Sequence, residues 1–368
     1  MNCLTNICWR MNKLEFRIRG FKCFFDSTFE LNKITLLTGA NASGKSSVIQ
    51  ALLLLNAASE AEESSYLINL ANRQMAFDFG QPDSLVNNEW LKDEVMITMS
   101  DGCILGFNSM NQDSNRILKV RVDNLSRLKD AFEKGLIYLC AERQGPRYEY
   151  KRQMGEEHGC GCHGENTGNV ISDSWNVKIK GDRMNRMVND SLFSIALDEW
   201  VDYIFPGISV RIQQVGSQNY QVIVRDGNHN VTTNSTNVGF GISYALPILV
   251  EGLLAKDGSW FVVENPEAHI HAKAQSNIGY FLGTMAAAGL RVIVETHSEH
   301  IVNGIRRAAI VGGRLTPEDV NIYFFNGKSK SELLAIDKYG NLSDFPVDFF
   351  DQSRQDMFEI IKWQRSAK

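Results

Sequence analysis

The stretch that decides the fold is Leu36-Leu37-Thr38-Gly39-Ala40-Asn41-Ala42-Ser43-Gly44-Lys45-Ser46-Ser47. It has the phosphate-loop pattern G-x-x-x-x-G-K-[ST], which is specific to nucleotide binding. The apolar, β-branched run at 34–37 predicts a buried strand before the loop, and the Leu-rich run at 48–58, which lacks Gly and Pro, predicts a helix after it. Because a phosphate loop joins a strand to a helix in this way, a chance Gly-rich turn is the weaker interpretation.

The chemistry of this loop predicts a triphosphate site. Its glycines let several backbone N–H groups point at one spot, and the helix N-terminus adds its dipole. We expect Lys45 to neutralise the β- and γ-phosphates and the Ser46 hydroxyl to ligate Mg²⁺. The predicted cofactors are therefore ATP and Mg²⁺. The residues expected to hold the nucleotide are Gly39, Asn41, Ala42, Ser43, Gly44, Lys45, Ser46 and Ser47.

Composition indicates an ordinary globular protein. The chain has 368 residues, of which 43% are apolar and 22% charged, which suits one large core or two lobes. No apolar run reaches the ~20 residues that a membrane helix needs, and residues 1–10 lack the features of a signal peptide. The seven cysteines, mostly scattered, fit a reducing compartment. We therefore predict a cytoplasmic protein with no membrane partner.

Charge gives no general argument for nucleic acid. The formal net charge is −5 and the sequence pI is about 5.9, so the composition does not predict a broadly basic surface that would bind DNA or RNA. A local basic groove that binds DNA stays open as an alternative. The sequence shows no internal repeat and no heptad run long enough for a coiled coil.

Short strands surround the phosphate loop in the N-terminal part. Residues 14–19 alternate apolar and charged side chains, which predicts a half-buried strand, and a turn at 20–26 leads into a second strand at 27–31. Residues 94–108 predict a hairpin that turns at Asp101-Gly102. Residues 136–140 form a further apolar run and predict another strand.

Two polar turns in this part have open interpretations. Gln81 sits where a loop glutamine could reach the Mg²⁺ or the attacking water, although a surface glutamine fits as well. The segment Ala141-Glu142-Arg143-Gln144-Gly145-Pro146-Arg147 follows a strand and carries two arginines. It predicts either a site for phosphate or a partner carboxylate, or a solvated turn with an ion pair.

Residues 151–186 predict an exposed, irregular insertion, because Gly, Asn and charged residues are frequent and periodicity is weak. Within it, His158-Gly159-Cys160-Gly161-Cys162-His163 offers four potential metal ligands in six residues. A tetrahedral zinc ion usually takes two well-separated pairs. We therefore favour a flexible Gly-rich loop over a metal site. Beyond it, residues 192–205 predict a helix that ends at Pro206-Gly207.

A second Gly-bearing loop lies in the C-terminal part. Residues 235–243 are small and precede an apolar helix predicted at 244–255, which is again the setting of an anion site. Residues 260–264 then predict a buried strand that ends in an acid, Glu264. Because this loop lies just before such a strand, we favour an anion site over a simple helix cap.

Acids at the end of that strand predict the metal side of the site. In nucleotide hydrolases, an acid here holds the water shell of the metal, and another just beyond it activates the attacking water. Glu264 is the natural metal-side acid, with Ser46 and Gln81 as the other candidate metal residues. Asn265 stands where a catalytic glutamate is expected, so Glu267 becomes the candidate base.

The next strand, predicted at 290–295, ends in Glu295-Thr296-His297-Ser298-Glu299-His300. A histidine at this place can bond the γ-phosphate and report its presence, which makes His297 a candidate site residue. The alternative is a Ser-His-Glu hydrolase built on Ser298. It lacks a G-x-S-x-G elbow, and the phosphate loop explains more of the sequence.

In this order, the motifs resemble the ABC-type ATPases of the SMC, RecF and OLD superfamily. The resemblance is carried by Gly20-Phe21-Lys22, the phosphate loop, the segment 141–147, Val238-Gly239-Phe240-Gly241-Ile242-Ser243 as a divergent signature loop, Glu264 to His271 as the Walker B region, and Glu295 to Ser298 as the switch-histidine loop. The chain looks most like short stand-alone bacterial AAA-family members of anti-phage defence systems, of the Septu or retron-associated kind.

This resemblance implies an α/β fold: an ABC-type P-loop NTPase head with a RecA-like core, a mixed β lobe and a helical lobe. It implies four segments: an N-terminal extension (1–12), the first part of the head (13–150), an irregular, lid-like insertion (151–230), and the second part of the head with its tail (231–368).

The resemblance also implies a dimer in which two heads sandwich two ATP molecules. Gly239, Gly241 and Ser243 of one copy would then act on the ATP of the other copy, and His297 would sense the γ-phosphate. Two departures, the missing Ser-Gly-Gly of the signature and Asn265 in place of an acid, imply slow hydrolysis or ATP used mainly as a dimerisation switch.

The implied function is an ATPase whose dimerisation controls a DNA transaction or a separate effector, such as a nuclease or toxin, in anti-phage defence. The alternative is a non-hydrolysing, ATP-gated scaffold. A transporter subunit fits poorly, because of the divergent signature, the long insertion and the chain length. A small-molecule P-loop kinase would not explain the signature and switch loops.

Overall fold

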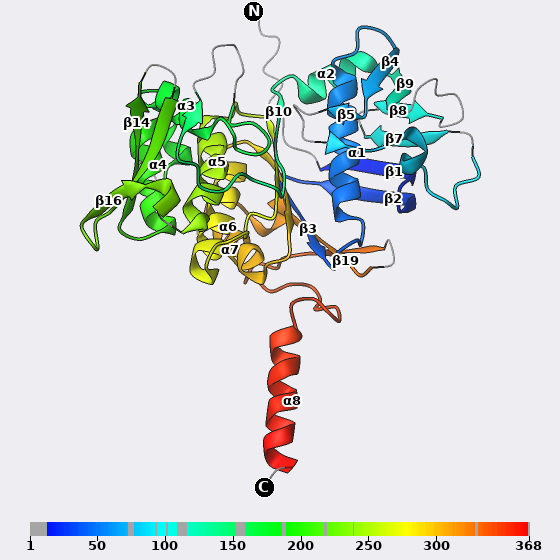
Figure 1. The fold of residues 1–368 in the computed structure, drawn as a ribbon. Helices are drawn as coiled ribbons and strands as arrows, with labels where there is room; N and C mark the ends of the chain where they lie inside the picture. Colours follow the sequence, from blue (N-terminus) through cyan, green and yellow to red (C-terminus); the bar gives the residue numbers. More distant parts are fainter. Residues whose placement is uncertain are drawn as a thin grey trace, which may run out of the picture.

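A computed structural model provides the structure. It describes residues 13–72, 77–92, 94–100, 102–108, 116–151, 159–185, 189–216, 219–237, 239–311, 313–327 and 330–366. The extension predicted at 1–12 lies outside these residues. Figure 1 shows a central sheet with a β-rich lobe on one side, a helical lobe on the other, and helix α8 (Gln352–Ser366) projecting from the body. This α/β architecture confirms the predicted fold class.

The central sheet has six strands in the order β10-β17-β18-β3-β19-β20. All of them run parallel except β20, which is antiparallel to β19. Their bounds are β10 (Leu136–Leu139), β17 (Trp260–Glu264), β18 (Arg291–Thr296), β3 (Ile34–Gly39), β19 (Val320–Phe325) and β20 (Ser331–Leu334). Because β17, β18 and β3 are parallel neighbours, with β18 in the middle, their carboxyl ends lie at the same edge of the sheet.

The β-rich lobe is an antiparallel sheet in the order β2-β1-β7-β8-β9-β4. Its strands are β2 (Phe24–Leu31), β1 (Leu14–Phe21), β7 (Val95–Met99), β8 (Ile104–Phe107), β9 (Ile117–Asp123) and β4 (Ser65–Asn69). Helix α1 (Lys45–Ser59) contacts β1, β4 and the short helix α2 (Leu125–Phe132). The strand pair before the phosphate loop and the hairpin after it are therefore confirmed.

The helical lobe contains α3 (Thr167–Ser174), α4 (Phe193–Ile204), α5 (Phe240–Leu254), α6 (Ala272–Ala287) and α7 (Glu299–Ile310). A small sheet accompanies them, made of β11 (Tyr150–Lys151), β15 (Asn219–Asp226), β14 (Ile208–Val215) and β16 (Val231–Asn234). The minor elements are β5 (Ala71–Asn72), β6 (Phe77–Asp78), β12 (Lys178–Ile179), β13 (Ser191–Leu192), and the 3₁₀ turns Pro82–Leu85, Gly181–Arg183, Ser235–Asn237 and Pro317–Asp319.

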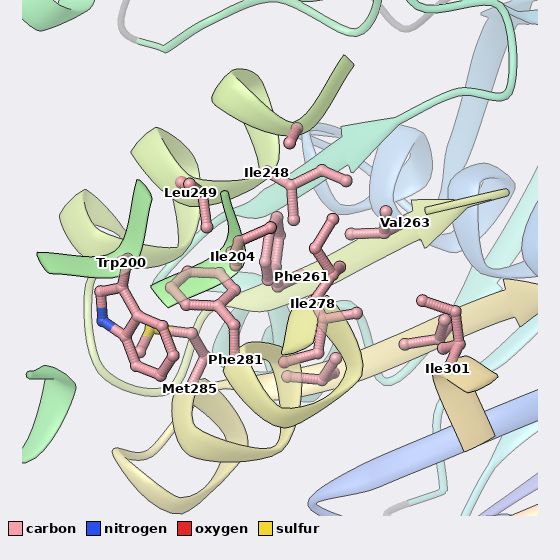
Figure 2. Close-up of a cluster of buried hydrophobic side chains, with 14 of the residues drawn as sticks. Trp200, Ile204, Ile248, Leu249, Phe261, Val263, Ile278, Phe281, Met285 and Ile301 are labelled. Carbon is pink, nitrogen blue, oxygen red and sulfur yellow. The ribbon is translucent and has the colours of Figure 1, made fainter. Parts of the chain in front are cut away.

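The hydrophobic core lies on both faces of the central sheet. Along β17, Phe261 and Val263 join the core of the helical lobe, whereas Trp260 and Val262 join the core of the β-rich lobe. A parallel strand covered on both faces reads as an uninterrupted apolar run, which explains why 260–263 does not alternate. Figure 2 shows the helical side, where the labelled residues of α4, α5, α6 and α7 pack against β17.

The sequence prediction for residues 151–186 is wrong over 159–185, the part of the segment that the structure describes. Cys160, Ile171, Ile179 and Met184 are buried in the core of the helical lobe. The Arg183 guanidinium donates to the carbonyl oxygens of Leu253 (2.9 Å) and of its neighbours at the C-terminal end of α5. Gly, Asn and charged residues are frequent between these side chains, so the composition of the segment does not reveal its packing.

Candidate nucleotide site

A cavity of about 470 Å³ lies at the carboxyl edge of the central sheet, beside the phosphate loop. The end of β17, the end of β18, the phosphate loop and the β1–β2 turn all contribute to its wall. The lining residues are Lys22, Cys23, Asn41, Ala42, Ser43, Gly44, Lys45, Ser46, Ser47, Ala141, Glu264, Asn265, Glu295 and His297. Most of the residues that the sequence predicts around the nucleotide therefore share one cavity.

The phosphate loop needs glycine at its two fixed positions. Gly39 has φ +126°, and a Cβ there would lie 2.2 Å from the Phe325 carbonyl oxygen of the neighbouring strand. Gly44 has φ +113° directly before α1, and a Cβ there would lie 2.8 Å from the Cys23 Sγ. The loop can therefore follow this path only because both positions lack a side chain.

Lys45 is folded back into the loop. Its Nζ donates to the carbonyl oxygens of Gly39 at 3.1 Å and Ala40 at 2.6 Å, and lies 3.9 Å from the Glu295 carboxylate. Burial lowers the pKa of Lys45, while the carboxylates of Glu295 and Glu267 oppose that shift. Lys45 lines the cavity, where a phosphate can replace the carbonyl partners of its ammonium.

Two buried polar atoms of the cavity wall fit an absent ligand. Ser43 is 2% exposed, and its hydroxyl has no hydrogen-bond partner within the described protein. The Oδ1 atom of Asn265 is buried and also lacks a partner there. Unpaired buried polar groups are costly. A ligand with its own donors and acceptors, such as Mg²⁺-bound nucleotide with its water shell, would satisfy them.

Glu264 occupies the end of β17, as predicted, and faces the cavity. Its carboxylate accepts a hydrogen bond from the Ala141 backbone N–H at 3.2 Å. Burial raises the pKa of Glu264, and hydrogen bonds from Tyr138 and Ala141 act against that rise. The side chain is therefore held toward β10, the strand on the far side of β17 from the phosphate loop.

Arg143 fixes the turn that carries the predicted acids. It is buried, and its guanidinium donates to the carbonyl oxygens of Cys140 (3.0 Å), Glu264 (2.5 Å) and Asn265 (2.6 Å). Its charge also lies 5.8 Å from the centre of the Tyr244 ring on α5. Neither interpretation of the 141–147 turn describes this arginine, because it binds backbone rather than phosphate or a carboxylate. Arg147, the other arginine, is exposed.

The residues after Glu264 connect the ends of β17 and β18. Asn265 has φ +44°, and its N–H donates to the Glu295 carbonyl oxygen at 2.9 Å. The Glu267 carboxylate accepts from the Thr296 hydroxyl at 2.8 Å and from the His297 backbone N–H at 2.7 Å. Glu267 is not among the residues that line the cavity. The candidate base thus holds the switch-histidine loop in place.

His297 lines the cavity next to the phosphate loop. Partial burial and the Lys45 ammonium lower its pKa, which favours the neutral imidazole. The adjacent Ser298 caps α7, since its Oγ accepts from the backbone N–H groups of His300 and Ile301. Its hydroxyl donates to the Gln275 side chain at 2.6 Å. This use of the hydroxyl speaks against the Ser-His-Glu hydrolase.

Several predicted residues lie away from the cavity. Gly239, Gly241 and Ser243 stand at the start of α5 and do not line it, and Ser243 is buried. A site completed by a second copy would require such a separation, so their predicted role stays a prediction. Gln81 is exposed and does not line the cavity either.

Sequence reasoning missed Glu295 as a site residue. Its carboxylate accepts from the Ser46 hydroxyl, with the two oxygens at 3.2 and 3.1 Å. Burial and the neighbouring Glu264 raise the pKa of Glu295 to about 7. The sequence did contain a signal for Glu295: like Glu264, it is an acid near the end of a mainly apolar strand.

The structure describes the histidine and cysteine cluster only from residue 159 onward. His158 lies outside the described residues. Cys160 and Cys162 are buried, and the His163 Nδ1 lies 2.8 Å from the Glu142 carbonyl oxygen and 3.1 Å from the Cys140 Sγ. Across the described part of the chain, no three His, Cys, Asp or Glu side chains are grouped so that they could hold a metal. Residues 159–163 form turns and bends, in agreement with the loop interpretation, and Cys160 packs in the core of the helical lobe.

Comparison with known families agrees with this geometry. A model described as "AAA ATPase domain" matches residues 163–302, and one described as "AAA domain" matches residues 15–137. A model described as "Protein of unknown function (DUF3696)" matches residues 315–360. No curated protein matches the sequence.

Solved structures of SMC heads share the fold. An SMC head bound to the C-terminal winged-helix domain of ScpA matches with a TM-score of 0.52 at 13% identity, covering 88% of this chain and 98% of that one. The SMC head with an extended coiled coil bound to the C-terminal domain of ScpA, from Pyrococcus furiosus, matches with a TM-score of 0.50 at 10% identity, covering 94% and 98%.

These findings define a P-loop NTPase with the fold of an SMC head. The two family models, which describe AAA ATPase domains, match residues on both sides of this fold. Among the described residues, no helix has the length and apolar character needed to cross a bilayer.

Proposed function

We propose that this protein binds and slowly hydrolyses ATP, and that ATP closes a dimer of two copies. The observation that carries the proposal is the shared cavity, where the buried Lys45 ammonium and the helix N-terminus meet the acids of two neighbouring strands. A triphosphate is the ligand that needs both a concentrated positive site and a metal.

The residues divide the chemistry among them. Lys45 would leave its loop carbonyls for the β- and γ-phosphates, and Ser46 and Glu264 would hold Mg²⁺, which neutralises phosphate charge when bound. Gln81 is exposed outside the cavity and could join the metal only if its loop moved. Glu267 is the proposed base that takes the proton of the attacking water. It is hydrogen-bonded to the N–H of His297, so the γ-phosphate sensor and the base are mechanically linked.

Asn265 is the reason for expecting a slow reaction. An amide cannot accept the proton of the attacking water, although its unpaired Oδ1 can orient that water. General-base catalysis typically contributes about 10²–10⁴-fold to the rate. A site whose base stands two residues further along the turn is expected to lose part of that contribution.

The dimer proposal concerns the residues outside the cavity. Gly239, Gly241 and Ser243 would complete the site of the second copy, at the start of α5. The related SMC heads are bound to ScpA, which supports an additional protein partner for this chain. We propose an effector such as a nuclease or toxin, in cytoplasmic anti-phage defence. DNA remains a further candidate partner.

The test compares wild type with Lys45→Ala, and with Lys338→Ala as an exposed lysine control. ATP binding is measured by calorimetry, hydrolysis by phosphate release, and mass by light scattering with and without ATP. We expect binding, turnover and ATP-dependent doubling of mass in wild type and the control, and their loss in Lys45→Ala. A well-folded wild-type protein that does not bind ATP would refute the proposal.

One observation favours a second candidate, the non-hydrolysing ATP-gated scaffold. Both oxygens of Glu267 already accept hydrogen bonds from the switch loop, so its carboxylate can be purely structural. Glu267→Gln separates the two functions. A fall in turnover with a longer-lived dimer supports the ATPase, whereas unchanged turnover contradicts the assignment of the base. Absence of turnover in wild type, with intact ATP-driven dimerisation, supports the scaffold.

A further inference from the structure

The acid that actually contacts the phosphate-loop serine is Glu295, on β18. Its carboxylate oxygens lie 3.2 and 3.1 Å from the Ser46 Oγ and one lies 3.9 Å from the Lys45 Nζ. Residue 295 is 6% exposed. Glu264 pairs with it in register across the parallel strands, but the Glu264 carboxylate bonds the Ala141 N–H instead. Strand order explains the difference, since β18 is the direct neighbour of the phosphate-loop strand and β17 is not.

Charge balance in the cavity shows what this carboxylate needs. The Lys45 ammonium lies beside the Glu295 carboxylate. When the ammonium turns to phosphate, the buried carboxylate loses its cation while the triphosphate adds negative charge. A buried carboxylate that loses its cation is strongly destabilised, even where one hydroxyl still donates to it. The two terminal nitrogens of Arg143 donate to three carbonyl oxygens of the neighbouring turn and do not contact Glu295 among the described hydrogen bonds.

We propose that Glu295 is a protein group of the magnesium site, placed beside Ser46, and that it makes nucleotide binding depend on the metal. The inference rests on the proposed ATP binding. Mg²⁺ takes oxygen ligands and is usually held by one or two carboxylates together with phosphates and water. Glu295 and Ser46 present a carboxylate and a hydroxyl at one point. The same carboxylate repels a metal-free triphosphate, so ATP without Mg²⁺ should bind poorly.

The experiment measures the dissociation constant of ATP by calorimetry in EDTA and in excess Mg²⁺, for wild type, Glu295→Gln and Glu264→Gln. Glu133→Gln, at an exposed carboxylate between α2 and β10, is the matched control for the carboxyl-to-amide change. In wild type and Glu133→Gln, we expect Mg²⁺ to tighten ATP binding strongly. In Glu295→Gln, that enhancement should shrink by about 10–100-fold, with metal-free ATP binding more tightly than in wild type. In Glu264→Gln, the enhancement of ATP binding by Mg²⁺ should shrink less than in Glu295→Gln.

A second variant protects the test against a folding defect. Glu295→Asp keeps the charge but shortens the side chain by one methylene, so we expect an intermediate dependence on Mg²⁺. Thermal melts establish that each variant is folded. Substituting Mn²⁺ adds an independent readout, because its paramagnetic resonance spectrum in the ATP complex should differ between wild type and Glu295→Gln.

The outcomes are distinct. An unchanged Mg²⁺ enhancement in Glu295→Gln, or one that falls only in Glu264→Gln, overturns the assignment of Glu295 while leaving ATP binding intact. Wild type that binds no ATP under either condition overturns the proposed function itself.

Discussion

Replacing Arg143 by methionine should destabilise the protein far more than its position in a polar turn suggests. The substitution removes three hydrogen bonds, to the carbonyl oxygens of Cys140, Glu264 and Asn265. It leaves these acceptors in a buried place, and an unsatisfied buried acceptor costs about 1–3 kcal/mol. Methionine keeps part of the apolar contact with Tyr244, and water can reach carbonyl oxygens at the cavity wall. For both reasons we take the low end of the cost per acceptor. The expected loss is about 3–5 kcal/mol.

The assay is thermal melting without nucleotide, with Arg147→Met as the control because Arg147 is exposed on the same turn. At about 2 °C per kcal/mol for a chain of this length, Arg143→Met should melt about 6–10 °C lower than wild type. Arg147→Met should change stability by less than about 0.5 kcal/mol.

Arg143→Lys sharpens this experiment. Lysine keeps the positive charge but lacks the planar fork that reaches several carbonyl groups at once, so its melting temperature should lie between those of wild type and Arg143→Met. ATP affinity should fall in the same order, because Arg143 fixes the backbone of Glu264 and Asn265 at the cavity. If Arg143→Met melts no lower than Arg147→Met, the reasoning is refuted.

Three further predictions concern the loop, a buried acid and the core. Gly39→Ala should abolish ATP binding and lower the melting temperature, because its Cβ would lie 2.2 Å from a carbonyl oxygen; normal binding would contradict this. Burial raises the pKa of Glu251 above its ordinary 4.5, so the folded state favours the protonated acid, and stability falls as pH rises from 4.5 through the raised pKa. Glu251→Gln should therefore raise the melting temperature more at pH 8 than at pH 5, and equal shifts would contradict the inference. Phe281→Ala, which removes a fully buried ring 4.9 Å from Trp200, should cost about 3–5 kcal/mol in denaturant unfolding, whereas Phe345→Ala, at an exposed position, should cost little.

The sequence was informative wherever the signal was local. The phosphate loop, the strand before it and the helix after it occupy fewer than thirty consecutive residues, and their fixed glycines follow from backbone geometry alone. The apolar run at 260–263 likewise identified a buried strand, because both faces of that strand are covered. These elements were enough to predict an α/β nucleotide-binding fold.

The missed residues depend on contacts between distant parts of the chain. Ser46 and Glu295 are separated by 249 positions, and Arg143 and Glu264 by 121. Only the order of strands in the sheet decides that β18, not β17, adjoins the phosphate loop. No spacing rule within a single sequence contains that order, so Glu295 remained one acid among several and Arg143 one arginine in a turn.

The same limit explains the error over 159–185. Cys160, Ile171 and Ile179 are buried, yet the segment around them is rich in Gly, Asn and charged residues. Their burial is created by α4 and α5, which lie elsewhere in the sequence. Composition measured within the segment could not detect surfaces supplied from outside it.

The position of α8 has a mechanical consequence. The segment that leads into it, from Val347 to Gln352, lines a second cavity of about 290 Å³ together with Gly39, Ala40 and His297. The helix therefore has its root at the nucleotide site and its tip well away from the body (Figure 1). Fifteen residues at 1.5 Å each make a rod of about 22 Å, so a tilt of about 10° at the root displaces the tip by about 4 Å. A change of angle in the segment 347–352 would therefore have its largest displacement at the exposed far end of α8.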